Sequence, residues 1–224
     1  MKWFLDLFSS SLGRKALMAL TGLFLIAFLT VHLAGNLQLL KDDNGESFNT
    51  YAEFMGTNGL IQFISKGNFT LILIHVIWAI MLSRKNRQAR GGVDYAITPK
   101  KSTWTSRNMG ILGTIILIFL VIHIRHFYAE AHFGSIPNQI YDGKEVKNLY
   151  GEVVRWFSVD WYVVLYVFCM GALGFHLWHG FASAFQTLGL NHMKYNGIIN
   201  FAGKAYAIII PALFAWIPIR MFFT

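Results

Sequence analysis

Long runs of apolar residues alternate with shorter polar stretches along the whole chain. A helix needs about 20 consecutive apolar residues to cross the hydrocarbon layer of a membrane, and the chain has five runs that approach or exceed this length. They cover residues 16–40, 60–82, 109–128, 162–185 and 198–222. The pattern predicts an all-α fold: an integral membrane bundle of five transmembrane helices that forms one domain over residues 1–224.

The residues before the first span predict a short helix of a different kind. Trp3, Phe4, Leu7 and Phe8 recur at helical spacing, which is typical of an amphipathic helix lying in the membrane interface. A frayed apolar tail is the alternative. A cleaved signal peptide is disfavoured, because the apolar run that follows continues to Leu40 without a small-residue cleavage site.

The composition agrees with a membrane protein. Hydrophobic residues make up 55% of the chain and charged residues only 13%, against roughly 25% charged in soluble domains. The net charge of +8 does not indicate a nucleic-acid partner, because Lys and Arg cluster at the ends of apolar runs, where they report membrane orientation. The positive-inside rule predicts a cytoplasmic N-terminus and an external C-terminus. Cys169 is the only cysteine, which excludes a multi-cysteine iron–sulfur or zinc site within the chain.

Histidines occur inside the predicted spans, where an ionisable side chain is costly. Spans one to four each contain at least one, and span five contains none. From the helical rise, His32 and His123 lie roughly 24 and 21 Å above the cytoplasmic ends of spans one and three. His75 and His176 lie roughly 10 and 14 Å above the cytoplasmic ends of spans two and four. These depths predict one pair of histidines near the outer face and a second pair nearer the inner face.

Two facing pairs of imidazoles are the ligand set of two stacked b haems, with one histidine from each of two helices on each iron. An iron with both axial positions filled favours electron transfer over oxygen chemistry. Small residues beside the histidines would let a flat macrocycle approach the backbone, although close helix–helix packing explains them as well. These residues are Ala34, Gly35, Gly171 and Gly174. The alternative for the whole set is polar contact between helices without haem.

Two further histidines lie three residues beyond a predicted ligand. His126 is in span three and His179 in span four, each about 60° further around its helix than that ligand. Either could replace its neighbour after a modest rotation, or could contact a haem propionate or water at the end of the site. His132 and His192 lie in polar connections and are expected to be solvated.

The residues around these histidines resemble those of a known family. Residues 11–22 (SLGRKALMALTG) and 31–36 (VHLAGN) look like the start of the cytochrome b558 subunits of succinate dehydrogenase. These subunits are the five-helix, dihaem type of succinate:quinone and quinol:fumarate oxidoreductase anchors. The resemblance continues through residues 73–75 (LIH), 118–123 (IFLVIH) and 174–176 (GFH), and covers nearly the whole chain.

The resemblance implies a multi-pass membrane anchor of a respiratory-chain complex in the bacterial inner membrane. In that family the first helix pairs with the third and the second with the fourth to hold two b haems, which corresponds here to His32 with His123 and His75 with His176. Electrons would pass through the two haems between an iron–sulfur subunit and a quinone, usually menaquinone, near the outer face. FAD and the iron–sulfur clusters would belong to partner subunits on the cytoplasmic face. The chain would thus be part of an enzyme but carry no dicarboxylate active site.

The chain departs from some relatives in span four. Gly174 stands where some fumarate-reducing members have a glutamate that is used for proton transfer. That particular proton route is therefore disfavoured here.

Polar residues near the outer ends of the spans are candidates for a quinone site, with Glu53 the principal one. The others are Asn36, Gln38, Tyr128 and Glu130, and each is also explained as an ordinary polar residue at a helix end. Two other functions remain open: a haem-free structural anchor, and the b-type cytochrome subunit of a hydrogenase or formate dehydrogenase. Haem content and the identity of the partner subunits distinguish the three.

Overall fold

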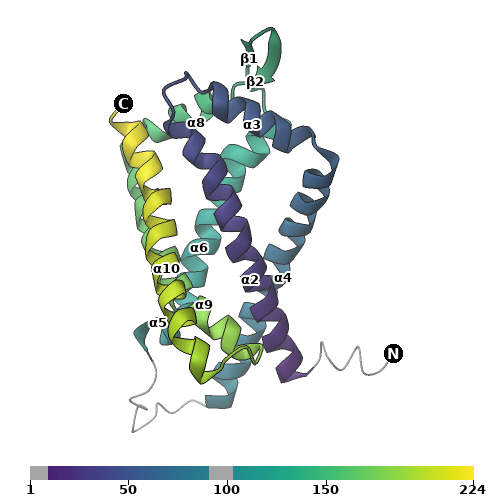
Figure 1. Ribbon diagram of the computed structural model, residues 1–224, viewed down its shortest axis with the longest axis vertical. Helices are drawn as coiled ribbons and strands as arrows, with labels where there is room; N and C mark the ends of the chain where they lie inside the picture. The colour runs from purple at the N-terminus through teal and green to yellow at the C-terminus, as the bar shows by residue number, and fades with distance from the viewer. Residues whose placement is uncertain (1–9, 91–102) are drawn as a thin grey trace.

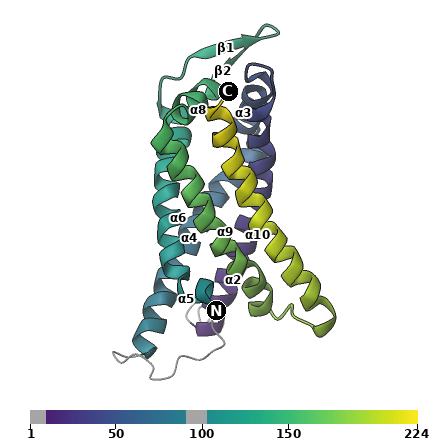
Figure 2. The same ribbon diagram turned by 90° about the vertical axis from the view of Figure 1, so that its left-hand side faces the viewer.

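The computed structural model describes residues 10–90 and 103–224, so the interfacial helix predicted around residues 3–8 lies outside the described residues. Five helices in these ranges are long and apolar enough to cross a membrane, and they run side by side in a bundle (Figures 1 and 2). They cover Ser11–Leu40, Gly59–Gln88, Met109–Phe133, Asp160–Thr187 and Met193–Phe222. The predicted all-α membrane bundle is thereby confirmed, with most span ends a few residues beyond the expected bounds.

Each span is built from one long helix, in two cases with a short extension. The long helices are α2 (Ser11–Asn36), α4 (Gly59–Arg90), α6 (Met109–His123), α9 (Asp160–Thr187) and α10 (Met193–Phe222). The 3₁₀ turn η1 (Leu37–Leu40) extends α2. The π-helix η2 (Ile124–Ala129) and the short helix α7 (Glu130–Phe133) extend α6, while α5 (Trp104–Arg107) precedes it.

Side-chain caps explain where two of the long helices begin. The hydroxyl of Ser10 accepts the Gly13 amide at 2.9 Å at the start of α2. At the start of α10, the exposed His192 accepts the Lys194 amide at 3.2 Å.

Helix α9 is the centre of the bundle and contacts α2, α6 and α10. The main hydrophobic core lies at the end of the bundle where the C-terminus is located, and Tyr162 and Tyr166 of α9 are among its members. The other helices are less covered by protein. In the most apolar part of the second and third spans only 6% of the residues are buried, against 39% in α9.

A cap of short elements covers the core end of the bundle, where only polar connections were expected. It consists of α3 (Glu46–Thr57), the strands β1 (Asn138–Tyr141) and β2 (Lys144–Lys147), and α8 (Leu149–Phe157). The strands pair antiparallel through a two-residue turn, in which Asp142 and Gly143 both have positive φ. The buried Asn49 of α3 joins the three parts of the cap through hydrogen bonds to the hairpin and to α8.

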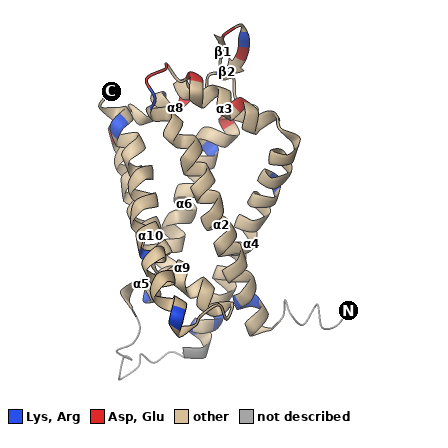
Figure 3. Cartoon of the chain, viewed as in Figure 1, with Lys and Arg blue, Asp and Glu red and all other residues tan. Residues whose placement is uncertain are grey.

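The two ends of the bundle differ in charge. Acidic side chains gather at the cap end, and a group of Lys and Arg lies at the opposite end, near the start of α2 (Figure 3). This is the asymmetry that the positive-inside rule uses. It agrees with the predicted orientation, in which the cap end faces outside, and the orientation itself stays a prediction.

Candidate functional site

The four histidines predicted as ligands form two facing pairs. The rings of His32 on α2 and His123 at the end of α6 have centroids 5.8 Å apart and planes at 90°. The rings of His75 on α4 and His176 on α9 have centroids 6.5 Å apart and planes at 65°. The structure therefore brings together the first span with the third and the second with the fourth.

The two pairs lie at different levels of the bundle. The hydroxyl of Thr21 on α2 is 3.0 Å from Nδ1 of His75, so Thr21 marks the level of the second pair on that helix. His32 stands eleven residues further along α2, a separation of about 16 Å at the helical rise per residue. The pairs are thus stacked along the bundle, with the His32–His123 pair toward the cap.

The spacing within each pair fits one metal ion between two imidazoles. A metal–imidazole bond of about 2 Å, with the ring centroid roughly 1 Å behind the ligating nitrogen, places two opposed imidazole centroids about 6 Å apart. The observed separations of 5.8 and 6.5 Å lie on either side of this value. Each pair therefore has about the ring separation that two imidazole ligands of one haem iron would need.

Glycines adjoin the second pair at two positions. A Cβ on Gly22 of α2 would lie 3.5 Å from Cε1 of His75, and one on Gly113 of α6 would lie 3.9 Å from Cε1 of His176. Neither glycine was singled out in the sequence. Their lack of side chains leaves room beside the imidazoles, which suits a flat macrocycle.

Two of the small residues that were singled out serve helix packing instead. A Cβ on Gly35 would lie 2.5 Å from the ring of Tyr51, and one on Gly174 would lie 3.1 Å from the carbonyl oxygen of Ala207 on α10. For these two positions the packing explanation holds.

The hydroxyl of Thr21 is the side-chain hydrogen-bond partner of His75. It donates to the carbonyl of Leu17 at 2.9 Å, and its lone pairs can accept an Nδ1–H from His75, whose Nδ1 lies 3.0 Å away. With the proton on Nδ1, the free lone pair is on Nε2, the form in which an imidazole binds a metal.

A chain of hydrogen bonds connects His123 to the cap. Nδ1 of His123 is 3.0 Å from the hydroxyl of Tyr166 on α9, and the hydroxyl of Tyr162 donates to that of Tyr166 at 3.3 Å. Tyr162 in turn is 3.0 Å from Nδ1 of His126. Both tyrosines are buried, so water does not compete for these hydrogen bonds.

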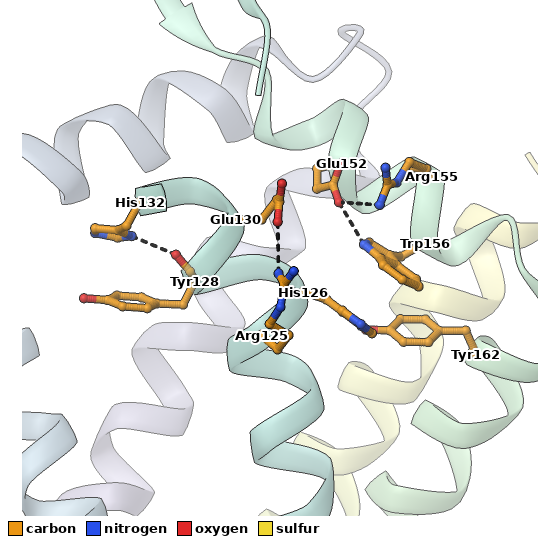
Figure 4. Close-up of polar contacts among 9 residues, drawn as sticks. All are labelled: Arg125, His126, Tyr128, Glu130, His132, Glu152, Arg155, Trp156 and Tyr162. Atoms are coloured by element: carbon orange, nitrogen blue, oxygen red, sulfur yellow. Dashed lines mark hydrogen bonds and ion pairs between the residues drawn. The ribbon is translucent and has the colours of Figure 1, made fainter. Parts of the chain in front are cut away.

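His126 forms the outer end of this chain and does not contact His32, whose ring partner from this span is His123. The His126 ring stacks on Trp156 of α8, with centroids 3.8 Å apart and planes 12° apart (Figure 4). Trp156 is held by a hydrogen bond from its Nε1 to Glu152 at 2.8 Å. The π-helix η2 explains the placement, because its wider turn moves side chains three residues apart further from each other than in an α-helix.

The second imidazole of each pair has weaker contacts. The ring nitrogens of His32 are 3.4 and 3.5 Å from the Asn36 amide nitrogen, beyond the usual range of a hydrogen bond. Nδ1 of His176 is buried and has no hydrogen-bond partner among residues 10–90 and 103–224. His179 is partly buried on α9, one turn from His176.

The structure does not gather the candidate quinone residues on α2, η1 and α3 into one site. Glu53 is exposed on α3. Gln38 lies in a shallow depression between η1 and α3 whose lining does not include Glu53. The Asn36 amide donates back to the carbonyl of His32 at 2.7 Å.

The remaining quinone candidates already have partners at the end of the third span (Figure 4). Glu130 forms an ion pair with Arg125 at 3.0 Å. The ring of Tyr128 stacks on the exposed His132 at 4.1 Å. A quinone site at these residues stays a prediction.

Sequence reasoning missed the partners of the two anchored histidines, Thr21 and Tyr166. The tyrosines could have been identified from their depth in the membrane. Tyr162 and Tyr166 lie near the outer end of span four, at the level of His123 and His126 in span three. Thr21 carried no such signal, since a threonine in a membrane helix commonly bonds its own backbone.

Comparisons with known proteins give no match: no family model, no curated protein and no solved structure is similar to the chain. The class of protein is therefore defined by the fold alone, a helical bundle with five helices able to cross a membrane.

Proposed function

We propose that this chain is the dihaem cytochrome b anchor of a succinate:quinone oxidoreductase. As such it is a membrane subunit that carries electrons between an iron–sulfur partner and a quinone, with menaquinone the expected species. The observation that carries the proposal is the two facing histidine pairs, stacked within one apolar bundle. The resemblance of residues 11–36 to cytochrome b558 subunits narrows this dihaem function to succinate or fumarate chemistry.

In this proposal His32 with His123 and His75 with His176 are the axial ligands of the two haems. When bound, such a haem supplies one-electron transfer with no coordination position left for oxygen. The chain's own residues prepare the ligands: Thr21 holds the proton of His75 on Nδ1, so that Nε2 is available. The apolar side chains of the spans keep water from the pairs, which limits reaction with other molecules.

The soluble partners are expected at the end of the bundle opposite the cap. Lys and Arg gather there, whereas the acidic residues of the described chain lie at the cap end. A flavoprotein with FAD and an iron–sulfur subunit on this face would be nearest to the His75–His176 pair, and a quinone at the cap end would be nearest to the His32–His123 pair.

Haem content tests the ligand assignment. The purified chain, with any co-purifying subunits, should give two b haems by a pyridine haemochrome assay and a reduced-minus-oxidised spectrum. His75→Ala and His123→Ala should each lower this count toward one, because each removes one ligand of a different pair. His132→Ala is the matched control, since that imidazole is exposed and its hydrogen bond within the described residues is to the carbonyl of Tyr128 in the same span. Absence of haem in the wild type would support the structural-anchor alternative.

The electron donor tests the assignment to succinate chemistry. In membranes containing the intact complex, succinate should reduce the haem absorbance, and the competitive inhibitor malonate should block this. Reduction by hydrogen or formate, with no response to succinate, would assign the chain to a hydrogenase or formate dehydrogenase instead.

A further inference from the structure

Each histidine pair contains one imidazole with a short side-chain hydrogen bond and one without. Nδ1 of His75 and Nδ1 of His123 each lie 3.0 Å from a hydroxyl oxygen, of Thr21 and of Tyr166 respectively. The opposed rings have no contact of this length to Nδ1 among the described residues. The two pairs thus share one plan, although different helices supply the hydroxyl.

We propose that Thr21 and Tyr166 are the positioning residues of the two haem sites. Each accepts the Nδ1–H of one axial histidine, fixes the orientation of that ring and leaves its Nε2 directed to the iron. The inference rests on the proposed function, because it concerns the same four histidines.

For Thr21 the direction of the hydrogen bond follows from the helix itself. Its hydroxyl proton is directed to the carbonyls of Leu17 and Met18, at 2.9 and 3.1 Å. With the proton used there, the oxygen accepts the Nδ1–H of His75 when Nε2 of that ring is bound to the iron. Since Thr21 is buried, this contact is not exchanged for one with water.

For Tyr166 the hydroxyl is held by a chain that begins on the surface of the cap. Trp156 stacks on His126, and His126 contacts Tyr162. The hydroxyl of Tyr162 then donates to Tyr166. The oxygen of Tyr166 has a lone pair that accepts the Nδ1–H of His123 when Nε2 of that ring is bound to the iron.

A hydroxyl that accepts the Nδ1–H makes the imidazole a more basic ligand. A more basic ligand stabilises the ferric iron and lowers its reduction potential. Thr21 and Tyr166 should therefore each lower the potential of a different haem.

Potentiometric titration of the complex in membranes tests this assignment. Thr21→Val keeps the shape of the side chain and removes the hydroxyl, and should raise the midpoint potential of one haem while the other stays at its wild-type value. Tyr166→Phe should raise the potential of the other haem alone. Thr21→Ser, which restores the hydroxyl, should return the wild-type potential. Two haems with unchanged potentials in both variants, or a shift of the same haem in both, would overturn the proposal.

Loss of a polar group near a haem also raises its reduction potential through a change in solvation. Tyr162→Phe separates this effect from the loss of the hydrogen bond to the ligand. If Tyr162 acts only through Tyr166, Tyr162→Phe alone should raise the midpoint potential of this haem less than Tyr166→Phe does. Adding Tyr162→Phe to Tyr166→Phe should then raise the potential no further. Additive shifts in the double variant would mean that the tyrosines act independently through solvation.

Nitrogen-15 spectra of histidine test the hydrogen bond without reference to electron transfer. In the haem-free chain, the side-chain signals of His75 should show a proton on Nδ1, and Thr21→Val should alter them but not those of His132. Unaltered His75 signals would overturn the positioning role even if the chain binds two haems. Absence of haem with the expected spectra would overturn the proposed function alone.

Discussion

Replacing Asn49 with alanine is expected to destabilise the cap as a unit. Its side chain is 1% exposed and holds three parts of the cap together. The amide nitrogen donates to the hydroxyl of Tyr141 at 3.0 Å and to Oδ1 of Asn148 at 3.2 Å. The amide oxygen accepts the backbone N–H of Tyr150 at 2.8 Å.

The expected loss follows from these three bonds. A buried backbone N–H left without an acceptor costs about 1–3 kcal/mol, and each neutral hydrogen bond contributes about 0.5–1.5 kcal/mol. Because bonds in one network are not additive, the free energy of unfolding should fall by about 2–4 kcal/mol.

The assay uses the only cysteine of the chain, Cys169, which is 3% exposed on α9. A thiol-reactive dye labels it when the bundle opens, so that the temperature of half-maximal labelling reports stability in detergent. Asn138→Ala is the matched control, because it removes one exposed hydrogen bond of the same hairpin, and it should change stability by less than about 0.5 kcal/mol. Hydrogen exchange at the Tyr150 amide reports local opening of the cap. Equal labelling temperatures and equal Tyr150 exchange rates in Asn49→Ala and Asn138→Ala would refute this role of Asn49.

Two further predictions concern the second histidine pair and the start of α3. Gly22→Leu should lower the haem count from two toward one per chain, because its side chain would begin 3.5 Å from Cε1 of His75. Gly67→Leu, a position with open space around it, should keep both haems, and equal counts in the two variants would contradict the steric argument. A hydrogen bond from Ser47 lowers the pKa of the Asp43 carboxyl, so its stabilising contribution is present above about pH 4 and is lost as the pH falls through the lowered pKa. Acidification from about pH 5 to pH 3 should therefore lower the midpoint temperature of unfolding, followed by circular dichroism, more in the wild type than in Asp43→Asn, and parallel curves would exclude this role.

The elements that follow from chain length and hydrophobicity were predictable. A membrane-spanning helix satisfies all its backbone hydrogen bonds within one segment, so five apolar runs are enough to define five helices. The cap was not predictable in this way. Residues 41–59 and 130–160 are polar, and their folding into α3, the hairpin and α8 depends on buried contacts such as those of Asn49.

The sequence by itself determined the spans, the charge asymmetry and the depths of the histidines, because each depends only on position along a helix of known rise. Only the tertiary structure decided what surrounds each imidazole. The π-helix after His123 turned His126 toward Trp156, and the packing of α2 against α4 brought Thr21 to His75. Such contacts depend on the rotation of one helix against another, and weakly amphipathic apolar helices do not reveal that rotation in their residue pattern.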